Sequence, residues 1–503
     1  MLDTTPLLRL YAAWRRRQLA RLDPAATQER LLLRLVARAA DTRFGQTHEF
    51  HRIRSVADFQ AQVPLRRYED FWRDWWQPPF PTLRGATWPD PVPFFALSSG
   101  TTSGATKHIP CTAAMLRSNT RAALDLLVHH VTHRPASRVF GGQSFMLGGS
   151  TDLTTVAPGI VAGDLSGIAR ARLPAWARRF GFPPLDIALM SDWETKLDRL
   201  AATAPKADIR LLTGTPSWLL ILFEQIAAKG LGDTAPEAFP RLELLVHGGV
   251  NFAPYRPRFE AWLAGSKAEL REAYPASEGF LAVADRGPGE GLRLMIDNGL
   301  FFEFVPMDEL DRPHPTRHWV ATMQPGIDYA LVLSSCAGLW AYVLGDTVTV
   351  VDRATPRVLI TGRTSWAVSF FGEHLIDAEI ETAIAAAAEA IGAMVTDFTL
   401  GADLPTGGLG GHVFLVEFEH APAPARISAF AAALDRKLAA LNDDYRAHRA
   451  EGFGLRAPEV HLVAPGGFAR WMKAQGRLGG QNKVPRVIGD PARFEAARRA
   501  LLA

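Results

Sequence analysis

The sequence predicts an α/β fold in two parts: a large N-terminal α/β domain that includes a β-barrel-like subdomain, and a small, mobile α+β C-terminal domain. Two observations predict this division. With 503 residues, of which 48% are hydrophobic, the chain is too long for one simple core but can bury two. The secondary-structure pattern also changes along the chain, because alternating strands and helices give way to strands joined by turns and then to a mixed tail. We expect the domains to span residues 1–363 and 364–503, with the boundary at residues 361–365.

The N-terminal domain is expected to begin with helices and to continue with alternating strands and helices. Helical patterns dominate to about residue 68, and a stretch rich in Trp and Pro at residues 72–93 predicts an irregular connection. Strands are predicted at residues 91–97, 209–213 and 242–246. The second strand is followed by a turn with Pro216 that opens a helix, and the third ends in His247-Gly248-Gly249.

The β-barrel-like subdomain is expected at residues 300–360, where strand patterns follow one another through turns. These strands are predicted at residues 301–305, 329–333, 340–344 and 348–351. The C-terminal domain is expected to contain helices at residues 376–391 and 427–441, and strands at residues 395–400, 413–418 and 459–463.

Composition excludes several classes of protein. The formal net charge is only +3 and no long block of Lys and Arg occurs, so we expect no nucleic-acid partner. The two cysteines, Cys111 and Cys336, are too few and too far apart in sequence for a disulfide framework or a cysteine zinc site, which favours the cytoplasm. Arginines interrupt the apolar residues of the N-terminus, unlike in a secretory signal, and no apolar stretch is long enough to span a membrane. We therefore expect no membrane contact and a first helix that packs on the domain.

The most informative segment is a loop rich in hydroxyl groups and glycine after the strand at residues 91–97. It reads Ser98-Ser99-Gly100-Thr101-Thr102-Ser103-Gly104-Ala105-Thr106-Lys107. Glycines let backbone N–H groups face an anion at close range, the hydroxyls add donors, and Lys107 adds positive charge. The spacing differs from that of a P-loop, so another kind of nucleotide site is indicated. The alternative is a flexible surface turn, which uses the same residue types.

A second candidate segment is Tyr274-Pro275-Ala276-Ser277-Glu278-Gly279. It offers an aromatic face for a base, a hydroxyl donor for a phosphate and a carboxylate for Mg²⁺. The alternative is a helix N-cap, in which Ser277 caps the helix and Glu278 faces the positive end of its dipole.

Two further segments complete the set. Tyr342-Val343-Leu344-Gly345-Asp346 is expected to end a strand, where Asp346 could accept hydrogen bonds from both ribose hydroxyls or simply form a β-turn. Near the end of the chain, Gly480-Gln481-Asn482-Lys483-Val484-Pro485-Arg486 is expected to form a loop. Lys483 could move into a site and stabilise phosphoryl charge, or it could be a solvated surface lysine.

In this order the four segments resemble the adenylate-forming superfamily and, within it, the auxin-responsive family of acyl acid amido synthetases. That family carries Ser-Ser-Gly-Thr-Ser/Thr-x-Gly-x-x-Lys-x-x-Pro, which residues 98–110 match. The tail is similar as well, with Leu441-Asn442-Asp443-Asp444-Tyr445, Arg449, Gly467-Phe468 and Gln481-Asn482-Lys483-Val484-Pro485-Arg486. The resemblance covers most of the chain and implies the adenylate-forming enzyme fold.

The resemblance also implies a role for each matching residue. The ATP phosphates would be bound by Ser98, Ser99, Gly100, Thr101, Thr102 and Gly104, with Lys107 close by. The adenine would be bordered by Gly248, Gly249, Val250 and Tyr274, and the ribose held by Asp346 with Arg363 beside it. The catalytic residues would be Ser277 on the α-phosphate, Glu278 as the Mg²⁺ ligand, and Lys483, which would stabilise the pentavalent phosphorus. The chain departs from the plant members at Pro275 and Val343, which puts fine contacts to the nucleotide in doubt.

The function implied is that of a ligase that needs ATP and Mg²⁺. A carboxylic acid would be activated as an acyl-adenylate and transferred to an amine, in most cases an amino acid. An acyl-CoA ligase and a non-catalytic nucleotide-binding protein are the alternatives. The sequence identifies neither the acid nor the amine.

Other catalytic patterns fit the chain less well. His129, His130 and His133 can share a helix face, but without a nearby cysteine or carboxylate they are expected to be surface residues. Ser144 lacks the second glycine of a nucleophile elbow, so no hydrolase triad is expected.

Overall fold

The computed structural model describes residues 3–98, 106–148, 153–172, 180–188, 190, 193–248, 252, 255–364, 368, 370–373, 375, 377–403, 409–449, 454–475 and 484–502. The chain forms two compact units. The large unit consists of Met1–Ser98, Lys107–Phe252 and Phe259–Thr364, and the small unit is built mainly from Ser365–Ala503. Among the described residues, no helix is long and apolar enough to cross a membrane.

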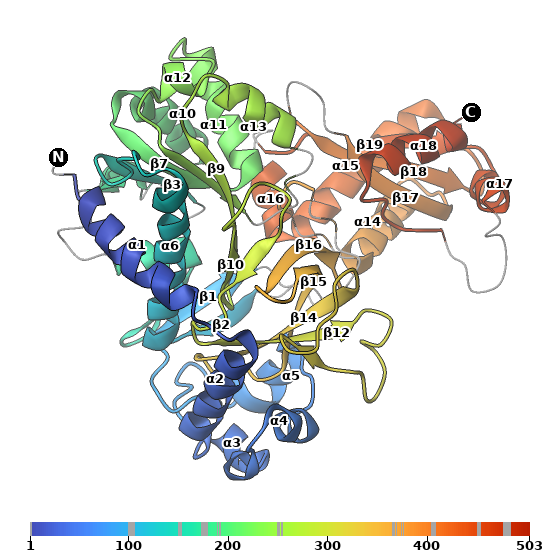
Figure 1. Cartoon of the computed structure of the whole chain (residues 1–503). Helices are drawn as coiled ribbons and strands as arrows, with labels where there is room; N and C mark the ends of the chain where they lie inside the picture. The colour runs from blue at the N-terminus through green and yellow to red at the C-terminus, as the bar shows by residue number, and fades with distance from the viewer. Residues whose placement is uncertain are drawn as a thin grey trace. The chain divides into compact units, whose positions relative to one another are not determined.

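The large unit begins with a series of helices, as the sequence predicts. These are α1 (Thr5–Leu19), α2 (Pro24–Ala39), α3 (Arg43–Thr47), η1 (Phe50–Arg52), α4 (Val56–Gln62), α5 (Tyr68–Phe71) and η2 (Trp72–Trp76). The N-terminus of α2 is fixed by Asp23, whose side chain accepts a hydrogen bond from the Ala26 backbone. α1 lies along the long helix α6 (Ala113–His133), and their apolar faces pack through residues such as Leu8 and Leu126 (Figure 1).

A 12-stranded sheet forms the centre of the large unit, in the order β13-β12-β14-β15-β16-β11-β10-β9-β8-β7-β3-β6. Its strands are β3 (Gln143–Leu147), β6 (Gly181–Phe182), β7 (Ile209–Gly214), β8 (Leu244–Gly248), β9 (Glu269–Ala276), β10 (Gly279–Val283), β11 (Leu292–Leu294), β12 (Leu300–Pro306), β13 (His318–Trp319), β14 (Asp328–Ser335), β15 (Tyr342–Asp352) and β16 (Arg357–Arg363). The run from β6 to β9 is parallel, and the strands from β9 to β13 are antiparallel.

Two details of this sheet differ from the sequence prediction. The antiparallel strands of the β-barrel-like part are hydrogen-bonded into the same sheet as the parallel strands, through β11 and β10. The strands predicted at residues 340–344 and 348–351 form one strand, β15, which irregular pairing with β14 and β16 interrupts. Gly345 lies in this strand with φ of +98°, a conformation that favours glycine, which explains why the sequence pattern breaks there.

A smaller sheet carries the glycine-rich segment. Its order is β2-β1-β5-β4, formed by β1 (Phe94–Ser98), β2 (Lys107–Cys111), β4 (Leu153–Ala157) and β5 (Ile160–Gly163). Among the described residues before residue 364, the other helices are α7 (Leu165–Ala171), α9 (Leu185–Ala188), α10 (Trp193–Thr203), η3 (Ala204–Lys206), α11 (Pro216–Ala228), α12 (Ala235–Ala238) and α13 (Arg256–Leu263).

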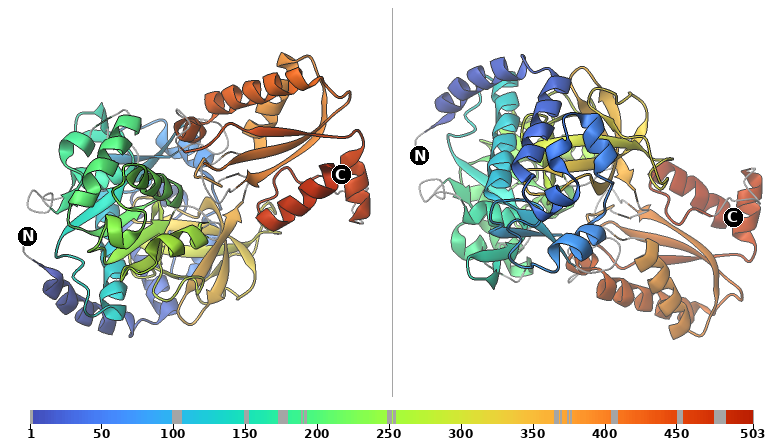
Figure 2. Two further views of the ribbon diagram at one scale, coloured as in Figure 1. Left: turned by 90° about the horizontal axis from the view of Figure 1, so that it is seen from above. Right: turned by 90° about the horizontal axis from the view of Figure 1, so that it is seen from below.

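The small unit is a three-stranded sheet covered by helices on both faces (Figure 2). The strands are β17 (Val395–Asp403), β18 (Gly411–Phe418) and β19 (Glu459–Val463), and the helices are α14 (Asp377–Ala390), α15 (Pro424–Leu441), α16 (Asp443–Arg449), α17 (Gly467–Ala474) and α18 (Pro491–Leu502). The central strand β18 is buried throughout because its alternate side chains face opposite ways. Phe414 and Val416 pack with α14 and α15, whereas Val413 and Leu415 pack with α17 and α18.

Candidate active site

The glycine- and hydroxyl-rich segment connects two antiparallel strands. Ser98 ends β1 and pairs with Lys107, which begins β2. A P-loop leads from a strand into a helix, whereas here a second strand follows, so the structure agrees with the spacing in excluding a P-loop. Ser99, Gly100, Thr101, Thr102 and Gly104 lie outside the described residues.

Lys107 is positioned by aromatic contacts at the base of this loop. Its ammonium group lies 5.3 Å from the ring centroid of Tyr68. The Tyr68 hydroxyl accepts a hydrogen bond of 2.9 Å from the backbone N–H of His108. Burial raises the pKa of Tyr68 to about 12, so the lysine contacts a neutral phenol.

Ser277 and Glu278 form the two-residue turn between β9 and β10, because Ala276 on β9 pairs with Gly279 on β10. No helix begins at this point, so the helix N-cap alternative for this segment is wrong. Ser277 is half-buried and Glu278 is only 8% exposed. The hairpin therefore holds a carboxylate inside the protein at the tip of two central strands.

A tyrosine donates a hydrogen bond to this carboxylate. Tyr342, at the start of β15, donates from its hydroxyl to Oε1 of Glu278 over 3.0 Å, and its side chain is fully buried. Burial raises the pKa of Glu278, while the charge of Lys107 and the hydrogen bond from Tyr342 oppose that rise. Tyr342 belongs to the Tyr-x-Leu-Gly-Asp motif, but this contact could not be predicted from sequence, because β16 and β11 separate β15 from β10 in the sheet and only the tertiary structure brings the two side chains together.

A second pair of the same kind lies nearby. The Tyr274 hydroxyl donates to Oδ2 of Asp346 over 2.5 Å. The negative charge of Asp346 also contributes to the raised pKa of Glu278. Asp346 lies near the start of β15 and not at the end of a strand as predicted, and its backbone pairs with that of Arg363 on β16.

Gly248 lies on β8, next to the part of β9 that carries Tyr274. It ends β8 and pairs with Ala273 on β9, and a Cβ at this position would lie 2.2 Å from the carbonyl oxygen of Ala273. Only glycine fits here, because the backbone of β9 occupies the space that a side chain would need. Gly249, Val250 and Lys483 lie outside the described residues.

The described part of the chain brings seven predicted or newly found residues together on the large unit, namely Lys107, Gly248, Tyr274, Ser277, Glu278, Tyr342 and Asp346. Within that part there is no group of three or more His, Cys, Asp or Glu side chains that could hold a metal ion.

The prediction of surface histidines is wrong for His129 and His130, which are both buried. His130 lies 2.6 Å through Nδ1 from Oε2 of Glu269 and 2.8 Å through Nε2 from Oγ of Ser137. The carboxylate partner is supplied by β9, far away in sequence, which is why spacing did not reveal it. The contacts from Ser137 through His130 to Glu269 use the residue types of a hydrolase triad. The Ser137 side chain is buried, however, and its hydroxyl is closed to substrates. The network therefore fixes the C-terminal end of α6.

Three domain models of the GH3 family match this chain. They are the GH3 family N-terminal domain at residues 15–169, the central domain at residues 293–363 and the C-terminal domain at residues 378–492. Together they cover more than half of the chain.

Relatives and solved structures agree with this match. An indole-3-acetic acid-amido synthetase of Oryza sativa subsp. indica is 28% identical over 269 residues, which are 50% of this chain and 44% of that protein. The chain thus aligns with less than half of this relative's length. An acyl acid amido synthetase structure solved with 2,4-DB has a TM-score of 0.59 at 17% identity, covering 95% of this chain and 94% of that one. A 2-hydroxyisobutyryl-CoA ligase structure has a TM-score of 0.57 at 16% identity, covering 95% and 91%.

Proposed function

This chain belongs to the GH3 family, and from that membership we propose that it is an acyl acid amido synthetase that uses ATP and Mg²⁺. The observation that carries the proposal is the pair of tyrosine–carboxylate hydrogen bonds, Tyr342 to Glu278 and Tyr274 to Asp346, which orient one carboxylate in the β9–β10 turn and one on β15. The negative charge of Asp346 helps to raise the pKa of Glu278, an electrostatic cost that a purely structural role would not require.

In this proposal the nucleoside part of ATP binds along β8, β9 and β15. Asp346 accepts hydrogen bonds from the ribose hydroxyls, and Tyr274 borders the adenine together with Gly248, Gly249 and Val250. The position of Gly248 supports this assignment, because it ends β8 and pairs with Ala273, the residue that precedes Tyr274. Arg363 pairs with Asp346 through the backbone, which supports its place beside the ribose.

The phosphates bind at the other side of the two carboxylates. Ser277 contacts the α-phosphate, and Ser98, Ser99, Gly100, Thr101, Thr102, Gly104 and Lys107 surround the β- and γ-phosphates. Glu278 is the proposed Mg²⁺ ligand, and the ion would neutralise phosphate charge. The hydrogen bond from Tyr342 supports this role, because it fixes one carboxylate oxygen and favours the ionised form that a cation requires.

The proposed reaction has two steps. A carboxylate oxygen of the acid attacks the α-phosphorus, the bond from that phosphorus to the bridging oxygen breaks, and pyrophosphate leaves. The nitrogen of an amine, most simply that of an amino acid, then attacks the carbonyl carbon of the acyl-adenylate. AMP leaves with the oxygen it gained, and the nitrogen loses a proton. Lys483 is proposed to stabilise the negative charge on the pentavalent phosphorus in the first step.

We propose that the reaction takes place in the cytoplasm. The two cysteines, Cys111 and Cys336, are both buried and free, which supports a reducing compartment.

Exchange of labelled pyrophosphate into ATP, measured over a panel of carboxylic acids, tests the first step. Each active acid is then incubated with ATP and either a set of amino acids or CoA, and the products are identified by mass. We expect an N-acyl amino acid and faster AMP release with the amino acid than with CoA.

The alternatives give different results in the same assays. The fold is shared with a CoA ligase, so the fold does not decide the acceptor. A thioester formed faster than any amide would replace the amide proposal with acyl-CoA ligation. If no acid supports exchange although ATP binds, the protein is a non-catalytic nucleotide-binding protein.

A further inference from the structure

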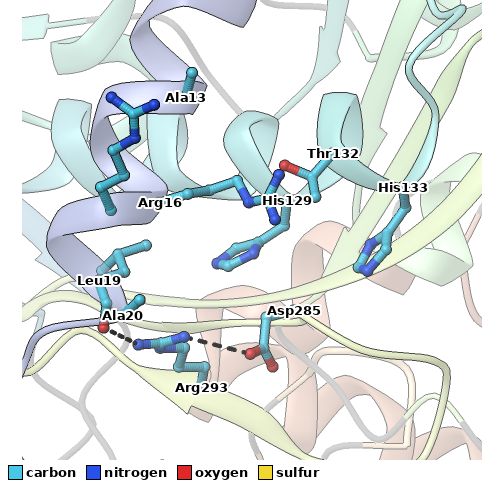
Figure 3. Close-up of a pocket in the computed structure, with 10 residues that line it drawn as sticks. Ala13, Arg16, Leu19, Ala20, His129, Thr132, His133, Asp285 and Arg293 are labelled. Carbon is cyan, nitrogen blue, oxygen red and sulfur yellow. Dashed lines mark hydrogen bonds and ion pairs between the residues drawn. The ribbon is translucent and has the colours of Figure 1, made fainter.

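A cavity of about 560 Å³ lies in the large unit between α1, the C-terminal end of α6 and β11 (Figure 3). Its lining residues are Ala13, Arg16, Arg17, Leu19, Ala20, His129, Thr132, His133, Asp285 and Arg293. A space of this size is within the range that small-molecule ligands occupy. None of these residues belongs to the proposed ATP site.

The cavity and the candidate active site lie at opposite ends of β10. Glu278 immediately precedes Gly279, the first residue of the strand, whereas Asp285 follows its last residue, Val283. At about 3.4 Å per residue, the two ends of β10 are roughly 14 Å apart. The cavity is therefore a separate site.

The acidic group in the cavity wall is already neutralised. Asp285 accepts two hydrogen bonds from Arg357, of 2.9 Å from Nε and 2.6 Å from Nη2. Arg293 lies 3.7 Å away on its other side and also donates to the carbonyl of Leu19 over 3.3 Å, as the dashed lines of Figure 3 show. These cations hold the pKa of Asp285 below its usual value.

The two other carboxylates near Arg293 are paired as well. Arg15 is a buried residue of α1. Its guanidinium donates to both oxygens of Asp125 and to both oxygens of Asp297. Arg121 adds a further bond of 2.7 Å to Asp297. These three carboxylates are therefore paired with arginines other than Arg16 and Arg17.

The remaining arginines of the cavity wall are Arg16 and Arg17. Both are exposed, and within the described chain no carboxylate lies within 4.0 Å of either guanidinium. α1 itself contains no acidic residue. Figure 3 shows Arg16 extending across the cavity toward Thr132 and His129. Both arginines line the cavity, and unpaired guanidinium groups there are suited to a phosphate dianion, because each can donate a fork of two hydrogen bonds.

Two histidines supply neutral polar groups. Nδ1 of His133 accepts a hydrogen bond of 2.5 Å from Nη2 of Arg271, which has only donors, so the proton of His133 is on Nε2. His129 is 9% exposed, and its ring has no hydrogen-bond partner among the described residues. Burial lowers the pKa of His129 to about 3, so its ring is neutral at physiological pH. With the Thr132 hydroxyl, these groups can bind the hydroxyls of an uncharged ligand part.

We propose that this cavity binds a small phosphate monoester, with Arg16 and Arg17 on the phosphate and Thr132, His129 and His133 on the polar remainder. A monoester fits better than inorganic phosphate because the volume exceeds that of the ion and Thr132, His129 and His133 add polar groups to the wall. This site lies beyond the proposed synthetase function and does not depend on it.

Calorimetric titration of the full chain, at constant ionic strength and without ATP, tests the proposal. The probes are glucose 6-phosphate and inorganic phosphate. We compare the parent with Arg16→Gln/Arg17→Gln and with a control, Arg30→Gln/Arg34→Gln, which removes the same charge from exposed positions of α2. The parent and the control should bind glucose 6-phosphate alike and inorganic phosphate more weakly. The cavity variant should bind at least about tenfold more weakly, as expected for the loss of hydrogen bonds to a charged group.

A second cavity variant, an active-site variant and a vesicle-binding measurement test the same proposal. Thr132→Val should weaken binding of glucose 6-phosphate but not of inorganic phosphate, and Asp346→Ala should change neither. The absence of probe binding to the parent, or an equal loss in the cavity variant and the control, overturns the proposal. So does binding that is confined to vesicles containing phosphatidic acid, since the arginines would then serve a membrane surface.

Discussion

The Tyr342 hydroxyl donates a hydrogen bond of 3.0 Å to Oε1 of Glu278, and both side chains are buried at the tip of the β9–β10 hairpin. Burial raises the pKa of this carboxyl group, and the hydrogen bond works against that rise. The charge of Lys107 and the hydrogen bond from Tyr342 both favour the ionised form that a Mg²⁺ ligand requires. Tyr342 is a positioning residue for the proposed metal ligand.

Tyr342→Phe should shift the acidic limb of the pH profile of pyrophosphate exchange to higher pH. The variant removes a donor that favours the charged carboxylate, so the pKa of Glu278 rises further and activity is lost at a higher pH than in the parent. A hydrogen bond to a charged group contributes about 1.5–3 kcal/mol, which corresponds to a shift of about one to two pH units.

Tyr329→Phe is the matched control for that experiment. Tyr329 is equally buried on β14, and its hydroxyl accepts a hydrogen bond from the Gln324 backbone, away from Glu278. We expect its pH profile to match that of the parent. If Tyr342→Phe lowers activity evenly at every pH, the tyrosine acts on the fold and not on the ionisation of Glu278.

Asp346→Ala should weaken ATP binding measured by calorimetry, by about tenfold or more, because a carboxylate that bonds to both ribose hydroxyls is lost. Tyr274→Phe keeps the carboxylate and the aromatic ring but removes the 2.5 Å hydrogen bond that orients Asp346, so a smaller loss is expected. Unchanged affinity in Asp346→Ala, with an intact fold by circular dichroism, would contradict the assignment of Asp346 to the ribose.

Lys483→Ala should slow pyrophosphate exchange by about a hundred- to a thousandfold, the usual effect of removing one stabiliser of a charged transition state. Amide formation from chemically supplied acyl-adenylate should stay within several-fold of the parent, because that step builds no charge on phosphorus. Lys473→Ala, at an exposed position of α17, is the control and should affect neither step. Equal losses in both half-reactions would remove Lys483 from the catalytic residues.

Much of this fold follows from local sequence pattern. Strand β19 spans residues 459–463 as predicted, and α15 ends at residue 441 as predicted. The periodicity of buried side chains is a local property of the sequence, so it predicts helices and strands without knowledge of the tertiary structure. β15 was read as two strands because Gly345 and its positive φ break the pattern, although hydrogen bonding continues on either side.

The contacts of the candidate site could not be predicted in the same way. Glu278 and Tyr342 are far apart in sequence, and two strands, β16 and β11, lie between β15 and β10 in the sheet, so only the tertiary structure brings the two side chains together. His130 was expected at the surface because its partners, Glu269 and Ser137, lie on another strand and beyond the end of α6. Motifs indicate which residue types matter, whereas the pairing of buried polar groups is a property of topology.

The buried Arg15 gives a prediction about stability. Its side chain is 1% exposed and forms ion pairs with Asp125 and Asp297, so α1 is joined to α6 and to the turn after β11. Arg15→Met would leave two carboxylates with a reduced set of partners in a buried place. We expect the free energy of unfolding of the large unit, measured in urea at pH 7, to fall by about 3–5 kcal/mol. Arg17→Met, at an exposed neighbouring position, should change it by about 0.5 kcal/mol or less.

The dependence of this loss on pH separates charge from packing. Hydrogen bonds from Arg15 hold the pKa of Asp297 below its usual value, although burial alone would raise it. A carboxyl group with a lowered pKa stabilises the fold above its unfolded pKa, and that contribution disappears as the pH falls through the folded value. The difference between Arg15→Met and the parent should therefore shrink as the pH falls below about 4, because protonation makes the unpaired carboxyls neutral. A difference that stays constant between pH 7 and pH 3 would mean that Arg15 stabilises the protein through packing and not through its charge.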